Sequence, residues 1–185
     1  AAINRASSSD LQFGTRLIVT NAKTPCPNGL TLWASLCNSS CGGIAYVGVY
    51  DNTGSNHDYY QPAIVFQNGV TSNAKYIAEA ASHEVGHNIG LSHDGSSTVG
   101  YYEGHGSWAP IMGVGYYRAI SQWSKGEYTG FVQKDDVAGG FPQATKSDPL
   151  TRTFDDLAVM FSFGASLVVD DHGGTTGTAT AVTAD

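Results

Sequence analysis

The chain has 185 residues, 41 % of them apolar, and a formal net charge of -7 at pH 7. This length and apolar content predict one globular domain with a hydrophobic core. Lys and Arg are too few to form a basic stripe for nucleic acid or an anionic membrane, and no apolar run approaches the length of a membrane span.

Three short segments have the apolar, β-branched composition of strands. They cover residues 15–21 (TRLIVTN), 42–51 (GGIAYVGVYD) and 63–66 (AIVF). In the second segment Ile44 and Tyr46 alternate with Ala45, so we expect them to face opposite sides of a sheet. The sequence DNTGSNHD that follows is rich in Gly, Asn and Asp and predicts a turn.

Two segments are predicted to form helices. The first, TSNAKYIAEAASHEVGHNIG, has apolar residues spaced by three and four and can be capped by Ser72 or Asn73. Gly90 is its natural end, because only glycine adopts a left-handed backbone without a steric cost. The second helix is expected over residues 153–163, with Thr153 or Asp155 near its start.

The composition changes after residue 94 to Gly, Ser, Tyr and Trp with little periodicity. We therefore expect one domain in two parts, followed by a tail. Residues 1–94 would form an upper subdomain with the sheet and the first helix, and residues 95–172 an irregular lower subdomain with the second helix. Residues 173–185 are low in complexity and predict a tail or a linker, which can lead into further domains of a longer parent chain.

The three cysteines, Cys26, Cys37 and Cys41, lie within sixteen consecutive residues, CPNGLTLWASLCNSSC. A thiolate zinc site normally uses four ligands in paired spacings, and this cluster supplies three at most. The favoured interpretation is therefore one disulfide and one remaining thiol, with the pairing left open; a chance cluster is the alternative. A disulfide would place the protein in an oxidising, extracellular compartment, so we expect a secreted protein.

Half of the six histidines lie in HEVGHNIGLSHD, residues 83–94. On a helix, His83 and His87 share one face one turn apart, so both imidazoles can bind one zinc ion. Glu84 lies next to the first ligand and projects beside the metal, where a general base for a metal-bound water is needed.

A third ligand is available because a turn at Gly90 would bring His93 back toward the ion. Three protein ligands leave a fourth position open for water, which is typical of a catalytic zinc site. Zinc lowers the pKa of that water toward about 7, and Glu84 can take its proton. The alternatives are histidines that only cap or pack a helix, and a zinc site without catalysis.

This motif, followed by IMG at residues 111–113, resembles the metzincin zinc endopeptidases. The resemblance implies that His83, His87 and His93 bind zinc, that Glu84 is the general base and that Met112 belongs to a Met-turn beneath the metal. It also implies an α/β fold, with a twisted mixed sheet and an active-site helix above an irregular lower subdomain. Asp94, directly after the third histidine, is similar to the adamalysin or reprolysin branch, and a bacterial-type secreted member fits the absence of the vertebrate disulfide pattern.

The segment GGIAYVGVYD resembles the edge strand that pairs with an extended substrate in this branch. The resemblance therefore implies that Ile44, Ala45 and Tyr46 contact substrate; plain sheet packing is the alternative. Tyr116 and Tyr117 are expected to shape the pocket for the residue after the cleaved bond, or to pack in the core. Val114 stands where astacins and serralysins carry a tyrosine, and only 82 residues precede His83, fewer than the family usually has.

Other polar residues are interpreted structurally. His105 is expected to order the loop before the Met-turn or to line the cleft, since zinc already has three histidines. His57 and His172 are expected at the surface. Calcium is not supported, because the acidic pairs at residues 135–136, 155–156 and 170–171 match no calcium-loop spacing and fit solvated or helix-start carboxylates.

The sequence thus predicts a secreted zinc metalloendopeptidase with one catalytic Zn²⁺. Protein or peptide substrates are the expected partners, and a propeptide is a further possible partner. Two rival hypotheses are an inactive or inhibited binding module on the same fold, and a zinc amidase that acts on a non-peptide amide.

Overall fold

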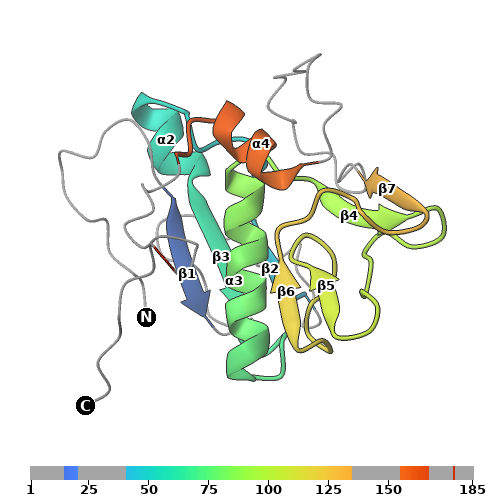
Figure 1. Cartoon of the computed structure of the whole chain (residues 1–185). Coiled ribbons are helices and arrows are strands. Elements are labelled where there is room, and N and C mark those ends of the chain that lie inside the picture. The colour runs from blue at the N-terminus through green and yellow to red at the C-terminus, as the bar shows by residue number, and fades with distance from the viewer. Residues whose placement is uncertain (1–14, 21–40, 135–154, 167–176, 178–185) are drawn as a thin grey trace.

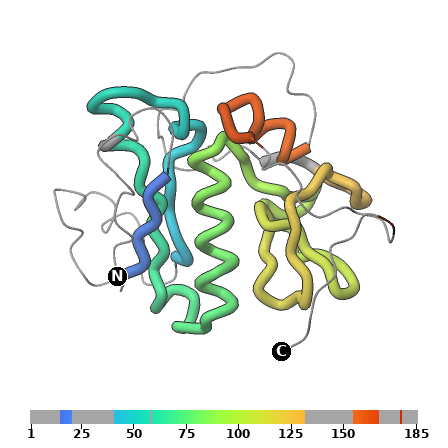
Figure 2. The backbone as a smooth tube through the Cα atoms, turned by 60° about the vertical axis from the view of Figure 1, so that its left-hand side comes forward, coloured from blue at the N-terminus to red at the C-terminus, as the bar shows by residue number. Residues whose placement is uncertain are grey.

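The computed structural model describes residues 15–20, 41–134, 155–166 and 177. The strands and helices are, in chain order, β1 (Arg16–Thr20), β2 (Gly43–Ile44), α2 (Gly54–Tyr60), β3 (Pro62–Phe66), α3 (Ala74–Asn88), β4 (His93–Ser96), β5 (Trp108–Pro110), β6 (Ile120–Gln122), β7 (Phe131–Lys134) and α4 (Asp156–Ser162). β1 and β3 lie on one side of the long helix α3 and the pairs β5–β6 and β4–β7 on the other, while β2, which completes the sheet with β1 and β3, is seen behind the helix (Figure 1). The same arrangement is visible in a turned view (Figure 2). The predicted mixed α/β class is confirmed.

The sheet is mixed and has the strand order β1-β3-β2. β1 is parallel to β3, with Ile18 beside Ile64, whereas β2 is antiparallel to β3, with Ile44 beside the same residue. All five residues of β3 are buried, because the strand is central in the sheet and α3 packs on it. Such burial matches its continuous apolar sequence, PAIVF. β2 lies at the edge of this sheet as the structure describes it.

The strand predicted over residues 42–51 is much shorter than expected. It ends after Ile44, and the chain leaves the sheet to meet the end of α3. The backbone N–H of Gly48 donates to the carbonyl of His87 at 2.8 Å, and those of Val49 and Tyr50 donate to the carbonyl of Asn88. These bonds satisfy carbonyl groups that a helix leaves unpaired at its C-terminus, and they remove the segment from the β-ladder.

The turn predicted at DNTGSNHD was wrong, because Gly54–Tyr60 form the helix α2. Thr53, at its N-cap, is a residue type that often caps helices, but its side chain makes no capping bond here. Burial of His57 and the packing of Tyr60 against Tyr46 stabilise this helix instead. His57, predicted at the surface, is only 6 % exposed and accepts a hydrogen bond from the Gln61 amide at 3.0 Å, and the Tyr60 ring packs edge-on against Tyr46.

The boundaries predicted for α3 are confirmed. The Asn73 side chain accepts hydrogen bonds from the backbone N–H groups of Lys75 and Tyr76, which caps the helix start. At the other end Gly90 has a φ of +96°. A Cβ atom at Gly90 would also collide with the ring of Phe163, so both backbone conformation and space require glycine there.

The second half of the described chain packs along α3, from Lys75 and Glu79 near its start to the residues that follow its end. β4 is antiparallel to β7, and β5 is parallel to β6. The predicted late helix is confirmed as α4, which Asp155 caps by accepting hydrogen bonds from two backbone N–H groups. A hydrophobic cluster joins α4 to the residues after α3 and to the segment after β5; its buried members are Leu91, Met112, Val159 and Met160.

Some predictions lie outside the described residues. These are Cys26, Cys37, Thr153, His172, the acidic pairs at residues 135–136 and 170–171, and all of the tail at residues 173–185 except residue 177. The subdomain boundaries at residues 94 and 172 stay predictions. In the described part of the chain, no helix is long and apolar enough to cross a membrane.

Candidate metal centre

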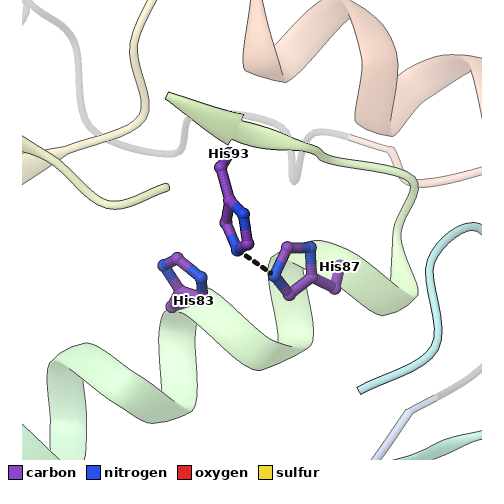
Figure 3. Close-up of side chains that lie close together, drawn as sticks. All are labelled: His83, His87 and His93. Atoms are coloured by element: carbon purple, nitrogen blue, oxygen red, sulfur yellow. Dashed lines mark hydrogen bonds between the residues drawn. The ribbon is translucent and has the colours of Figure 1, made fainter. Parts of the chain in front are cut away.

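Three histidines from two elements converge beside α3. His83 and His87 lie one turn apart on this helix, and His93 begins β4 (Figure 3). One nitrogen from each ring can be chosen so that all three lie within 4.8 Å of one another. His87 and His93 are buried and His83 is half-buried. The chain reversal at Gly90 is what returns His93 to the face that the two helical histidines share.

Backbone carbonyls set the orientation of two of these rings. His83 Nδ1 lies 2.8 Å from the carbonyl oxygen of Ile111, and His87 Nδ1 lies 2.7 Å from that of Leu91. A carbonyl can only accept, so each Nδ1 carries the proton and donates it. In the neutral rings the Nε2 atoms therefore keep their lone pairs, which is the tautomer that metal ligation through Nε2 needs.

The donor set fits a zinc ion. His87 Nε2 and His93 Nε2 are 3.0 Å apart. Two nitrogens bound to one zinc ion at about 2.0–2.1 Å and at a tetrahedral angle lie about 3.3–3.4 Å apart. Only a slight opening of this pair and a small movement of His83 would bring all three to one ion. Three neutral imidazoles are also ligands that zinc prefers.

Met112 lies directly under the helix that carries two of the histidines. Its side chain is fully buried, and a Cβ atom added to Gly86 would lie 2.7 Å from its sulfur. Its carbonyl oxygen accepts a hydrogen bond from Asp94 N at 2.9 Å. The segment that contains Ile111 and Met112 thus contacts both α3 and β4, and Gly86 permits this approach because it has no side chain.

Glu84 lies between α3 and the edge strand β2. It is 7 % exposed, and a Cβ atom added to Gly43 would lie 2.6 Å from its Oε1. The carboxylate is therefore next to His83 in sequence and against the backbone of β2 in space. Neither Gly43 nor Gly86 was singled out in the sequence; the only signal for Gly86 was its place inside the HEVGH motif.

A cluster of three buried polar residues, Asp94, Ser124 and Asp156, was not predicted. Ser124 Oγ donates to Asp94 Oδ2 at 2.6 Å, and Ser124 N donates to Asp156 Oδ2 at 2.7 Å. Burial raises the pKa of Asp94 to about 6. Burial, together with the nearby Asp94 carboxylate, raises the pKa of Asp156 to about 8. The two residues at 155–156 therefore have different roles: Asp155 caps α4, and the buried Asp156 links α4 to Ser124, in the segment after β6.

The three proposed substrate residues are half-buried; Ile44 ends β2, and Ala45 and Tyr46 follow the strand. The Ile44 side chain packs against the core residues Ile64 and Phe66, so its backbone is the part that a substrate could meet. The carbonyl of Tyr46 accepts a hydrogen bond from the Asn88 side chain at 3.0 Å, which ties this segment to the end of α3. Ala45 lies between these two residues. Their contact with substrate stays a prediction.

Tyr116 lies near the start of β2, whereas Tyr117 faces solvent. The Tyr116 hydroxyl is 2.9 Å from the position of a Cβ atom on Gly42, and burial, with a smaller contribution from the Glu84 charge, raises the pKa of Tyr116 to about 12. Lys75 Nζ holds this loop by donating to the carbonyls of Gly115 and Tyr116 at 3.0 and 3.3 Å. Tyr116 therefore lies close to both Glu84 and the edge strand.

His105 is separate from the three-histidine cluster. Its Nδ1 is 3.0 Å from the Tyr102 hydroxyl, and its backbone exchanges two hydrogen bonds with Trp108. These contacts order the loop before β5, which is one of the two roles predicted for His105. Among the residues that the structure describes, only His83, His87 and His93 group closely enough to hold a metal.

Comparison with known protein families assigns the chain to a family of peptidases. A reprolysin model of metallo-peptidase family M12 matches residues 7–120, well over half of the chain. Comparisons with the curated proteins and with the solved structures gave no match. The matched range contains β1, all of α3, the three histidines and Met112. The chain therefore belongs to metallo-peptidase family M12.

Proposed function

We propose that the chain is a secreted zinc-dependent endopeptidase in which His83, His87 and His93 hold the metal and Glu84 is the general base. The observation that carries the proposal is the convergence of three imidazoles, two of them oriented by backbone carbonyls, beside a buried glutamate. Membership of a metallopeptidase family supports peptide-bond hydrolysis as the reaction at this site. We take Met112 and its neighbours to be the Met-turn of the metzincin fold.

A zinc ion bound at the three imidazoles would polarise the substrate carbonyl and lower the pKa of a water molecule to about 7. Glu84 would accept the proton of the attacking water and return it to the leaving amine nitrogen. Its low exposure suits this role, because a buried carboxylate is shielded from bulk water and held at one place by β2 and α3.

The edge strand would bind the substrate backbone. In the described sheet β2 pairs with β3 along one side only, so its other side can accept an extended peptide. An antiparallel peptide would run with its C-terminal part toward Gly42 and Tyr116. Ile44, Ala45 and Tyr46 would then contact the residues before the cleaved bond, and Tyr116 and Tyr117 would border the pocket for the residue after it.

Secretion is proposed from the cysteine cluster. Cys41 packs against Ile64 and Phe66 at the edge of the sheet, and a disulfide to Cys26 or Cys37 would tie the segment between them to the core. Thiol titration of the unfolded protein, before and after reduction, tests this proposal. One free thiol before reduction and three after it would support the disulfide, whereas three free thiols in both states would refute it.

The test of the peptidase uses two glutamates on the same helix. Glu84→Gln should keep one zinc per chain and lose cleavage of unfolded casein by several orders of magnitude, since the amide cannot accept the proton. Glu79→Gln is the matched control, because Glu79 binds Lys75 and Ser121 away from the histidines. Near-normal cleavage by Glu84→Gln would remove Glu84 from the mechanism.

The rivals give different results in the same assay. A binding module would take up zinc and bind peptide without cleaving it. A zinc amidase would leave casein intact but release amine from a non-peptide amide in a substrate panel.

A further inference from the structure

Tyr101 lies beside the histidine cluster, on the loop between β4 and β5. Its ring centroid is 4.2 Å from that of His93 and 6.1 Å from that of His83, and its plane is inclined by 28° to the plane of the His83 ring. Tyr101 nevertheless remains 46 % exposed. A large ring that packs against the cluster and still faces solvent is part of the surface that a bound substrate would meet.

The neighbouring residue holds this loop in place. Tyr102 N donates to the carbonyl of Asp94 at 2.8 Å, and the Tyr102 carbonyl accepts from Val114 N at 2.9 Å. The Tyr102 ring stacks on that of Tyr128, with centroids 3.9 Å apart and planes inclined by 8°. Because Tyr102 is fixed through its backbone and its ring, the backbone of Tyr101 is positioned before any substrate arrives.

The exposed side chains of this loop indicate which kind of substrate side chain it would bind. Val99, two residues earlier, is also exposed, so the same loop presents a second apolar side chain to solvent. A positioned tyrosine ring offers a large contact area at little cost in conformational entropy. The partner that fits such a surface is an apolar or aromatic side chain.

We propose that Tyr101 is a specificity-determining residue, whose exposed ring packs against an apolar substrate side chain beside the cleaved bond. This inference rests on the proposed peptidase function. A role in which Tyr101 only fixes the orientation of the His93 ring makes a different prediction, because loss of the ring would then weaken zinc binding for every substrate alike.

The experiment measures binding without turnover, on zinc-loaded full-length protein that carries Glu84→Gln. The probes are fluorescent extended hexapeptides that are identical except for Leu, Phe or Ala at one of the two central positions. Binding is followed by fluorescence anisotropy and zinc content by metal analysis. The variants are Tyr101→Phe, which keeps the ring, and Tyr101→Ala, which removes it. Tyr59→Ala is the matched control, because it removes another exposed tyrosine, on α2.

Tyr101→Ala should bind the Leu and Phe peptides about tenfold more weakly, lose the preference for them over the Ala peptide and keep one zinc per chain. Tyr101→Phe and Tyr59→Ala should bind as the parent does. The proposal is overturned if Tyr101→Ala keeps the preference, if it loses zinc and weakens all peptides equally, or if the parent binds no peptide. Failure of the peptidase proposal is seen separately, as wild-type protein that holds zinc but cleaves no casein.

Discussion

Gly43 offers a direct test of the position of Glu84. A Cβ atom at this residue would lie 2.6 Å from both Cγ and Oε1 of Glu84 and 2.8 Å from its Cδ. Gly43 is not among the glycines with positive φ, so alanine is compatible with its backbone. Gly43→Ala would therefore act through the collision with Glu84.

The size of the effect follows from the overlap. Ordinary contacts of a Cβ atom begin at 3.4 Å, so the methyl group must displace the Glu84 carboxylate, or β2, by about 0.8 Å. A misplacement of about 1 Å in a catalytic group costs about a hundredfold in rate. We expect kcat/KM for a peptide substrate to fall about a hundredfold, while zinc content stays at one per chain.

The control for an added methyl group is Gly177→Ala, because no heavy atom lies within 4 Å of the Cβ position there. This variant should behave as wild type in the same peptide cleavage assay. Urea unfolding of Gly43→Ala shows whether the sheet itself is weakened. If Gly43→Ala is folded, holds zinc and cleaves at the wild-type rate, the assignment of Glu84 as a base fixed against β2 is refuted.

Two further variants test the support of the site. Gly86→Ala puts a methyl group 2.7 Å from the Met112 sulfur. It should therefore lower the free energy of unfolding by about 1–3 kcal/mol and weaken zinc binding. Urea unfolding and zinc titration that both match wild type would contradict this. The pKa of Asp156 is raised to about 8 in the folded protein, against about 3.9 in the unfolded chain. Between these two pH values the folded state holds a proton on Asp156 that the unfolded state has lost, so the free energy of unfolding falls as pH rises. Asp156→Asn cannot lose a proton there, so its free energy of unfolding should rise relative to that of wild type by up to about 1.4 kcal/mol per pH unit. Urea unfolding of both proteins at saturating zinc, between about pH 5 and about pH 8, measures this difference. A difference between the two proteins that does not change with pH would contradict the prediction.

The sequence predicted best where one residue decides the backbone. Asn73 and Gly90 fix the ends of α3 by local capping chemistry, and the three-and-four spacing places His83 and His87 on one face. The return of His93 follows from the turn at Gly90. These features depend on neighbours in the chain, so they were accessible without the fold.

The errors arose where distant contacts decide. The segment after Ile44 leaves the sheet because the carbonyls at the end of α3 bind its N–H groups. α2 forms although its N-cap side chain makes no bond, because His57 is buried and the Tyr60 ring packs against Tyr46, which lies outside the helix. No local pattern carries either fact.

The parts of the site that were missed share this cause. Tyr101, Ser124 and Asp156 reach the histidine region from loops and from α4, and none has a fixed spacing to the HEVGH motif. Gly43 matters only because Glu84 lies against it. Its importance could not be seen before the strand and the helix were placed side by side.

The most direct test of the central claim is cleavage of unfolded casein by the purified chain, measured with a zinc chelator, without it, and after zinc is restored. We predict cleavage that the chelator abolishes and that zinc brings back. Cleavage that persists when metal analysis shows no zinc on the chain would contradict the claim that His83, His87 and His93 hold the metal for peptide hydrolysis. So would a chain that holds one zinc and leaves casein intact.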